Sequence, residues 1–130
     1  LMAHRVTKRK KAVLSGGLHP HYAEVIRGLS AMASDTVTTL PADVAAAEDI
    51  IGQIDATTSC VVVQNPDVFG NLRDLRPIAA ACQKHGALLI AVVTEAVSLG
   101  LVESPGAMGA DIVVGEGQSI GVGLNFGGPY

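Results

Sequence analysis

Five short apolar runs, separated by segments with helical spacing, constrain the fold of this chain more than any other feature. The runs are residues 12–15, 36–40, 59–64, 87–94 and 111–114, and most of them are rich in β-branched residues. Strands that alternate with helices form a mainly parallel sheet through right-handed crossovers, with helices packed on its faces. The pattern therefore predicts a three-layer α/β fold.

Three segments between the runs have the spacing of amphipathic helices. The first begins near Pro20, which suits the first helical turn. The second follows Pro41, with Asp43 as its candidate N-cap. The third runs from Asp74 until Gly86 ends it. Their apolar positions are, in turn, Tyr22, Val25, Ile26, Leu29 and Met32; Val44, Ala47, Ile51 and Ile54; and Leu75, Ile78, Ala79 and Cys82.

The composition agrees with a buried sheet. The chain has 130 residues, 48% of them hydrophobic, but only 3% are aromatic and none is Trp. Its core must therefore consist of Val, Ile, Leu and Ala, as in strands covered on both faces. The apolar runs are too short to span a membrane and no signal-peptide pattern is present, so we expect a cytoplasmic protein. Leu1 in place of an initiator Met suggests a piece of a longer chain.

The charge is unevenly distributed. The net charge is −3, yet five of the nine basic residues lie in the first eleven positions: Arg5, Lys8, Arg9, Lys10 and Lys11. A basic segment can bind nucleic acid, but this one has no interleaved aromatic residues and leads directly into an apolar run. We expect a solvated entry to the first strand and no nucleic-acid site.

No metal or dinucleotide site is indicated. Cys60 and Cys82 lie in apolar stretches without metal-ligand spacing, and we expect both to be buried. His19 and His21 lack placed carboxylate or thiol partners for a metal ion. The Gly115-x-Gly117 pattern after the last run resembles a dinucleotide loop, but the third glycine is displaced to Gly121 and no helix pattern follows.

The candidate functional residues follow the runs. Ligands of parallel sheets bind just beyond the carboxyl ends of the strands, which here present His19, Asn65, Glu95 and Ser119. Taken alone, these residues have structural explanations as well. His19 can cap the helix that begins at Pro20, Asn65 precedes Pro66 in a common turn dipeptide, and Glu95 can be a solvated or capping carboxylate.

In combination, several motifs resemble one family. They are Arg5-Val6-Thr7-Lys8-Arg9-Lys10-Lys11, His19-Pro20-His21-Tyr22, Gln64-Asn65-Pro66, Gly109-Ala110-Asp111-Ile112-Val113-Val114-Gly115-Glu116-Gly117-Gln118-Ser119 and Phe126-Gly127-Gly128-Pro129-Tyr130. Together they resemble the glycine-cleavage P-protein family, in particular its subunit 1 (alpha subunit), over the whole chain and in order. The resemblance implies a pyridoxal-phosphate (PLP) fold-type I large domain. Residues 1–130 are then a single partial domain, without the upstream phosphate-binding loop and the C-terminal small domain.

The resemblance also assigns roles to the residues after the strands. His19 corresponds to the ring that lies over the cofactor's pyridine, and Asn65 to the residue that contacts its phenolic oxygen. Glu95 corresponds to the carboxylate that binds the pyridine nitrogen, although that residue is usually the shorter Asp. Ser119 stands where cofactor-binding members have the lysine that forms the Schiff base. These four residues therefore imply a degenerate cofactor pocket with no catalytic residue.

By the same resemblance, the chain is part of subunit 1 of glycine dehydrogenase (decarboxylating), which forms a heterodimer with a subunit 2 that carries PLP. The complex decarboxylates glycine and passes the aminomethyl group to the lipoyl arm of the H-protein. Two alternatives stay open at this stage. One is an independent PLP fold-type I enzyme, such as an aminotransferase, and the other is a nucleotide-binding or non-catalytic α/β interaction module.

Overall fold

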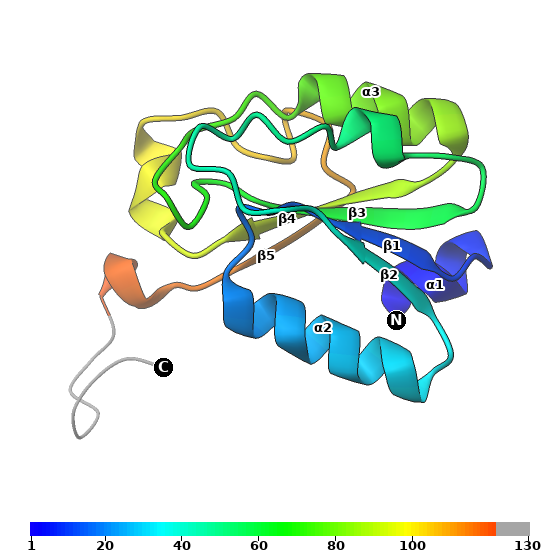
Figure 1. Cartoon of the computed structure of the whole chain (residues 1–130). Helices are drawn as coiled ribbons and strands as arrows, with labels where there is room; N and C mark the ends of the chain where they lie inside the picture. Colours follow the sequence, from blue (N-terminus) through cyan, green and yellow to red (C-terminus); the bar gives the residue numbers. More distant parts are fainter. Residues whose placement is uncertain (122–130) are drawn as a thin grey trace.

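The computed structural model describes residues 1–121, and Figure 1 shows their central sheet between layers of helices. The strands are β1 (Lys11–Leu14), β2 (Thr36–Thr39), β3 (Thr58–Gln64), β4 (Leu88–Val93) and β5 (Ile112–Gly115). They form a five-stranded sheet in the order β2-β1-β3-β4-β5, and every neighbouring pair is parallel. The three-layer α/β prediction is confirmed.

The helices divide between the two faces of the sheet (Figure 1). The short α1 (Met2–Thr7) and α2 (Pro20–Met32) lie on one face, and α3 (Arg76–His85) lies on the other. Alternate residues of the strands point to opposite faces, so Val61 and Val63 of β3 pack toward α3, whereas Cys60 and Val62 pack toward α2. All seven residues of β3 are buried, as expected for a central strand.

Helix α3 agrees with its prediction to within two residues. Pro77 lies in its first turn, where the missing N–H costs nothing. It ends at Gly86, whose φ of 68° is in the left-handed region that favours glycine. The Arg9 guanidinium donates hydrogen bonds to the carbonyls of His85 and Thr58, at 2.6 and 3.1 Å, and so joins this end of the helix to the sheet.

The predicted second helix is wrong. Residues 43–54 form a loop that contains only one short 3-10 helix, η1 (Ile51–Gln53). Ala46 has a φ of 52°, which no right-handed helix allows, and the Asp43 carboxylate accepts from the backbone N–H of Ala45 in a turn. Ile50 and Ile54 are buried in the core although the backbone that carries them is irregular. Their burial accounts for the apolar spacing.

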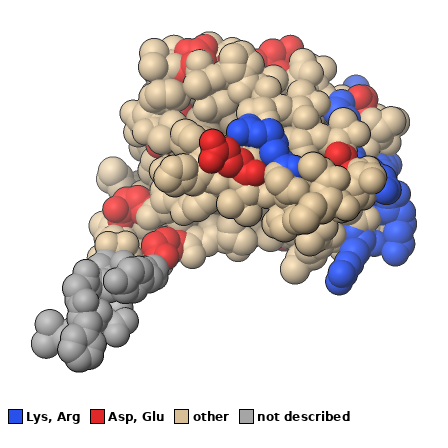
Figure 2. Space-filling model, turned by 60° about the horizontal axis from the view of Figure 1, so that its bottom comes forward, with Lys and Arg blue, Asp and Glu red and all other residues tan. Residues whose placement is uncertain are grey.

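The basic segment also differs from its prediction, because α1 was not expected before β1. The side chains of His4 and Thr7 contact Ser59 Oγ at 2.7 and 2.8 Å, which joins α1 to the start of β3. Exposure of Arg5, Lys8 and Lys10 is as expected. Figure 2 shows blue side chains gathered at one end of the molecule, which is the end where β1 begins.

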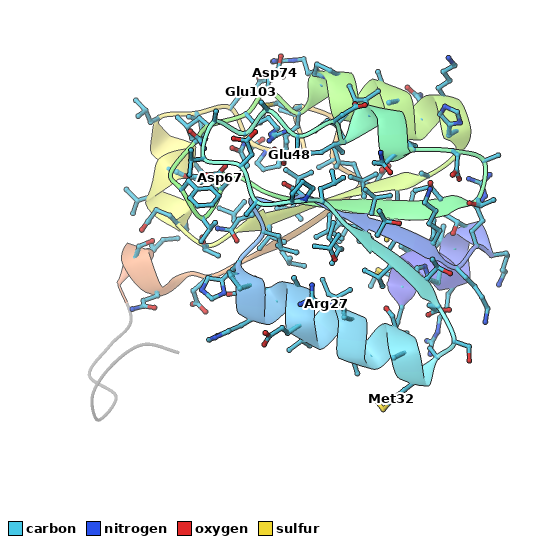
Figure 3. All side chains as sticks on the ribbon, viewed as in Figure 1. Arg27, Met32, Glu48, Asp67, Asp74 and Glu103 are labelled. Carbon is cyan, nitrogen blue, oxygen red and sulfur yellow. The ribbon has the colours of Figure 1, made fainter. Side chains whose placement is uncertain are left out.

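Most of the apolar side of α2 is not in the core. Val25 is 60% exposed and Met32 is 79% exposed, and Figure 3 shows Met32 pointing away from the sheet. The helix contacts the sheet through its buried positions, Ala23 and Ser30, and through the partly buried Ile26. Its apolar stripe therefore remains open within the described residues. None of the helices described is long and apolar enough to cross a bilayer.

Candidate functional site

The ends of β1, β3, β4 and β5 lie along one edge of the sheet, because all strands run in the same direction. The connections that leave this carboxyl edge include the 3-10 helices η2 (Ala96–Gly100) and η3 (Gln118–Ile120), drawn in yellow and orange in Figure 1. We refer to the four candidate residues His19, Asn65, Glu95 and Ser119 as the carboxyl-edge set. Each of them follows a strand of this edge.

His19 is the N-cap of α2. Its Nδ1 accepts a hydrogen bond from the backbone N–H of His21 at 3.3 Å, and its ring lies near the rings of His21 and Tyr22, with centroids 5.1 and 5.2 Å away. The backbone N–H of His19 donates to Gln64 Oε1 at 3.0 Å. The capping explanation is therefore confirmed, and the ring is held at the start of the helix.

Asn65 is buried and binds the backbone of a neighbouring segment. Its Nδ2 donates to the carbonyl of Arg73 at 3.1 Å, and its Oδ1 accepts from the N–H of Arg73 at 3.0 Å. The side chain thus binds both the backbone N–H and the backbone carbonyl of Arg73. In this arrangement Asn65 positions Arg73 at the carboxyl edge.

Arg73 in turn belongs to a buried polar group that the sequence did not reveal. Its Nη2 donates to Glu48 Oε1 at 2.9 Å, and Ser15 Oγ donates to the same oxygen at 2.6 Å. The Glu48 side chain is only 2% exposed, and its Oε2 has no hydrogen-bond partner among the described residues. Figure 3 shows Glu48 on the α3 side of the sheet, together with Asp67. No motif spacing could have indicated this group, because its members come from three separate loops.

Asp67 shapes the loop that follows Asn65. Its Oδ1 accepts from the backbone N–H groups of Phe69 and Asn71, at 2.9 and 2.8 Å. Gly17 packs directly against this carboxylate, since a Cβ on Gly17 would lie only 2.8 Å from Asp67 Cβ. The loops after β1 and β3 are therefore in close contact on this edge.

Glu95 and Ser119 are brought together across η2 and η3. A hydrogen bond with Ser119, and a second one from the backbone N–H of Val97, lower the pKa of Glu95 from its usual value. The Val97 N–H lies 3.1 Å from Glu95 Oε1, so this carboxylate also caps η2. Both side chains are exposed. The pair is a solvent-accessible carboxylate and hydroxyl, and the carboxylate is ionised at neutral pH.

The edge has no amine. The four lysines of the chain are Lys8, Lys10, Lys11 and Lys84. The first three lie at or before the start of β1, and Lys84 lies in the last turn of α3, just before β4 begins. All four are at the opposite end of the strands from Ser119. These residues do not fit a covalently bound PLP, because a Schiff base requires an amine next to the cofactor aldehyde.

An apolar groove of about 460 Å³ lies between α2 and the sheet, where residues of β1, β3, β4 and β5 line it. Leu1 and His4 line one end of the groove, and Thr94 and Glu116 line the end at the carboxyl edge. Members of the carboxyl-edge set are not among its lining residues. Within residues 1–121, no group of three or more His, Cys, Asp or Glu residues is placed to hold a metal ion.

Comparison with known proteins decides the family. The family model described as "Glycine cleavage system P-protein" matches residues 1–130. The chain belongs to this family. It is 76% identical over its full length to the probable glycine dehydrogenase (decarboxylating) subunit 1 of Methylocella silvestris. It is 69% identical to the protein of the same name from Beijerinckia indica. The chain spans 29% of the length of each of these relatives.

Solved structures agree with this family. A crystal structure of glycine decarboxylase (P-protein) of the glycine cleavage system, in inhibitor-bound form, matches 99% of the chain at 40% identity, with a TM-score of 0.86. The chain covers 29% of that protein. A cystathionine gamma-lyase from Lactobacillus plantarum matches 84% of the chain, and 28% of the lyase is covered, at 20% identity with a TM-score of 0.65. The family resemblance and the PLP fold-type I class are therefore confirmed.

Proposed function

We propose that this chain is part of a non-catalytic subunit of glycine dehydrogenase (decarboxylating). The main support is that Ser119 lies beside Glu95 at a carboxyl edge that has no lysine, in a chain of the P-protein family. Relatives that are 69% and 76% identical are named subunit 1, which implies a second subunit. An independent PLP enzyme would need an amine at this edge.

In this proposal the partner subunit carries PLP, which would supply the electron sink for the loss of carbon dioxide from glycine. The complex then transfers the aminomethyl group to the lipoyl arm of H-protein. The present chain contributes to the wall of the assembly and supplies no nucleophile. His19, Asn65, Glu95 and Ser119 remain as a degenerate pocket, in which Asn65 and Glu95 bind neighbouring backbone groups. We place the complex in the cytoplasm.

We also propose that residues 1–130 are one part of a larger domain. Parallel sheets are normally covered on both faces. Here Val113 and Val114 of β5 are each 47% exposed, and the groove under α2 leaves Ile90 and Val92 open. The relatives are more than three times as long as this chain, so they have ample polypeptide to cover these surfaces.

Coexpression tests the proposed function. The full-length protein and a subunit 2 should copurify, and the pair should exchange the carboxyl group of glycine with labelled bicarbonate in the presence of lipoylated H-protein. The full-length protein alone should show no exchange. Exchange by this protein without subunit 2, or failure of the two subunits to associate, would contradict the proposal.

A further inference from the structure

Gln64 connects the two sides of the carboxyl edge. It is the last residue of β3, and its side chain is buried, with the residue 4% exposed. Its Oε1 accepts a hydrogen bond from the backbone N–H of His19 at 3.0 Å. Its Nε2 donates to Thr94 Oγ1 at 3.3 Å. Since β1 and β4 are the two neighbours of β3, one carboxamide joins the loops that follow both of them.

A glutamine suits this position for a physical reason. A buried carboxamide is costly unless its oxygen and nitrogen both find partners, and here each of them does. The oxygen holds the N-cap residue of α2, while the nitrogen holds the residue that directly precedes Glu95. A leucine of similar size would leave the His19 N–H and the Thr94 hydroxyl without this partner. A glutamate would keep an oxygen for each of them.

We propose that Gln64 is a positioning residue that fixes the His19 ring relative to the Thr94–Glu95 segment. It acts through the backbone of His19, because it does not contact the imidazole. This inference rests on the proposed function only in taking His19 and Glu95 as parts of one degenerate pocket. The position of the ring is a physical property of the chain, and it can be measured without turnover.

The test is the rate at which diethyl pyrocarbonate acylates His19 in the full-length protein, mapped by mass spectrometry. The reagent attacks an unprotonated imidazole nitrogen, and the His19 Nδ1 is engaged by His21 N–H while the cap is intact. Gln64→Leu removes the bond that holds the His19 backbone, and this should loosen the cap and free Nδ1 more often. The His19 rate should rise by about two- to tenfold, the range expected when one net hydrogen bond is lost. Gln64→Glu should restore a rate near that of the wild type.

The matched control is Ser59→Ala, at the opposite end of the same strand. Ser59 is also buried and hydrogen-bonded, so its loss destabilises β3 without touching the carboxyl edge. Its His19 rate should equal that of the wild type. An unchanged rate in Gln64→Leu would overturn the proposal, and so would an equal increase in Ser59→Ala.

If Gln64→Leu does not fold, Thr94→Val replaces it. This change keeps Gln64 and removes only the oxygen that its amide binds. It should raise the His19 rate in the same direction, and no increase would refute the link between the two loops. Because the assay needs no glycine turnover, a failure of the proposed enzymatic role would leave this result unaffected.

Discussion

Arg73 donates a hydrogen bond from Nη2 to Glu48 Oε1 at 2.9 Å, and the two side chains are only 18% and 2% exposed. The backbone of Arg73 is bound by Asn65, and the Glu48 carboxylate is bound by Ser15. This ion pair therefore connects the loops after β1 and β3 with the segment between β2 and β3. It is the most buried charged contact of the carboxyl edge.

Arg73→Met should lower the free energy of unfolding by about 3 kcal/mol or more, because it leaves the buried Glu48 carboxylate without its partner. The matched control is Arg76→Met, since Arg76 pairs with Asp74 and Glu103 at the surface, where water screens both ion pairs, and its loss should lower the free energy of unfolding much less. Urea unfolding of the full-length protein measures both. Equal losses in the two variants would show that the Arg73 pair is not a buried one.

Ser119→Ala should raise the pKa of Glu95, because the hydrogen bond with Ser119 is the largest cause of its lowering. The pKa of Glu95 is lower in the folded state than in the unfolded state. The contribution of this contact to stability is therefore complete above the unfolded-state pKa and is lost as the pH falls through the folded-state pKa. The carbon-13 shift of the Glu95 carboxyl, followed through acid pH, reports the change.

The control for this titration is Ser98→Ala. The Ser98 hydroxyl donates to the backbone carbonyl of Glu95 and does not contact its carboxylate. Its removal should leave the titration of Glu95 where it is in the wild type. A Glu95 pKa that is the same in Ser119→Ala and in the wild type would mean that Ser119 does not hold the carboxylate.

The two thiols should be unreactive in the folded protein. Burial raises the pKa of Cys60 to about 11 and that of Cys82 to about 12. At pH 8 the thiolate of each is then on the order of 100-fold or more scarcer than in a free cysteine, whose pKa is about 8.5. Iodoacetamide should label both residues only after unfolding in urea. Rapid labelling of Cys60 in the native protein would show that the groove it lines is open to solvent down to the strand.

Polar substitution of the apolar stripe of α2 should reduce self-association in the short chain but lower the free energy of unfolding in the full-length protein. In residues 1–130, Leu29→Gln with Met32→Gln should reduce self-association at little cost in stability, because these side chains are 45% and 79% exposed. In the full-length protein, where we expect the stripe to be covered, each change should cost about 1.5 kcal/mol or more.

Sedimentation velocity and urea unfolding measure the two effects. Glu24→Gln, an exposed change on the same helix, is the control and should alter neither. If the double variant is neutral in the full-length protein, the stripe faces solvent there too, and the stripe gives the partial-domain proposal no support.

The sequence predicted those elements whose local pattern and tertiary role agree. The five strands follow from short apolar runs and α3 from apolar spacing, and Gly86 ends α3 as its position indicates. Helix α2 also forms where it was predicted, although most of its apolar stripe is exposed. The helix predicted after Asp43 failed, because the Glu48 carboxylate turns inward to Ser15 and Arg73 and Ala46 adopts a left-handed backbone. Those partners lie far apart along the chain, so no local pattern contains them.

The candidate site was predictable in its position but not in its contacts. Parallel topology alone places His19, Asn65, Glu95 and Ser119 after strands of one edge. That Asn65 holds the backbone of Arg73, or that Gln64 spans His19 and Thr94, depends on side-chain packing in three dimensions. The motif at 126–130 lies outside the described residues.

Mapping PLP after borohydride reduction of the copurified two-subunit complex tests most directly whether this chain belongs to a non-catalytic subunit. Reduction fixes the cofactor to whichever lysine holds it. We expect one phosphopyridoxyl group per heterodimer, on a lysine of subunit 2, and no stoichiometric label on Lys8, Lys10, Lys11 or Lys84. One group per chain, mapped to any one of these four lysines, would contradict it.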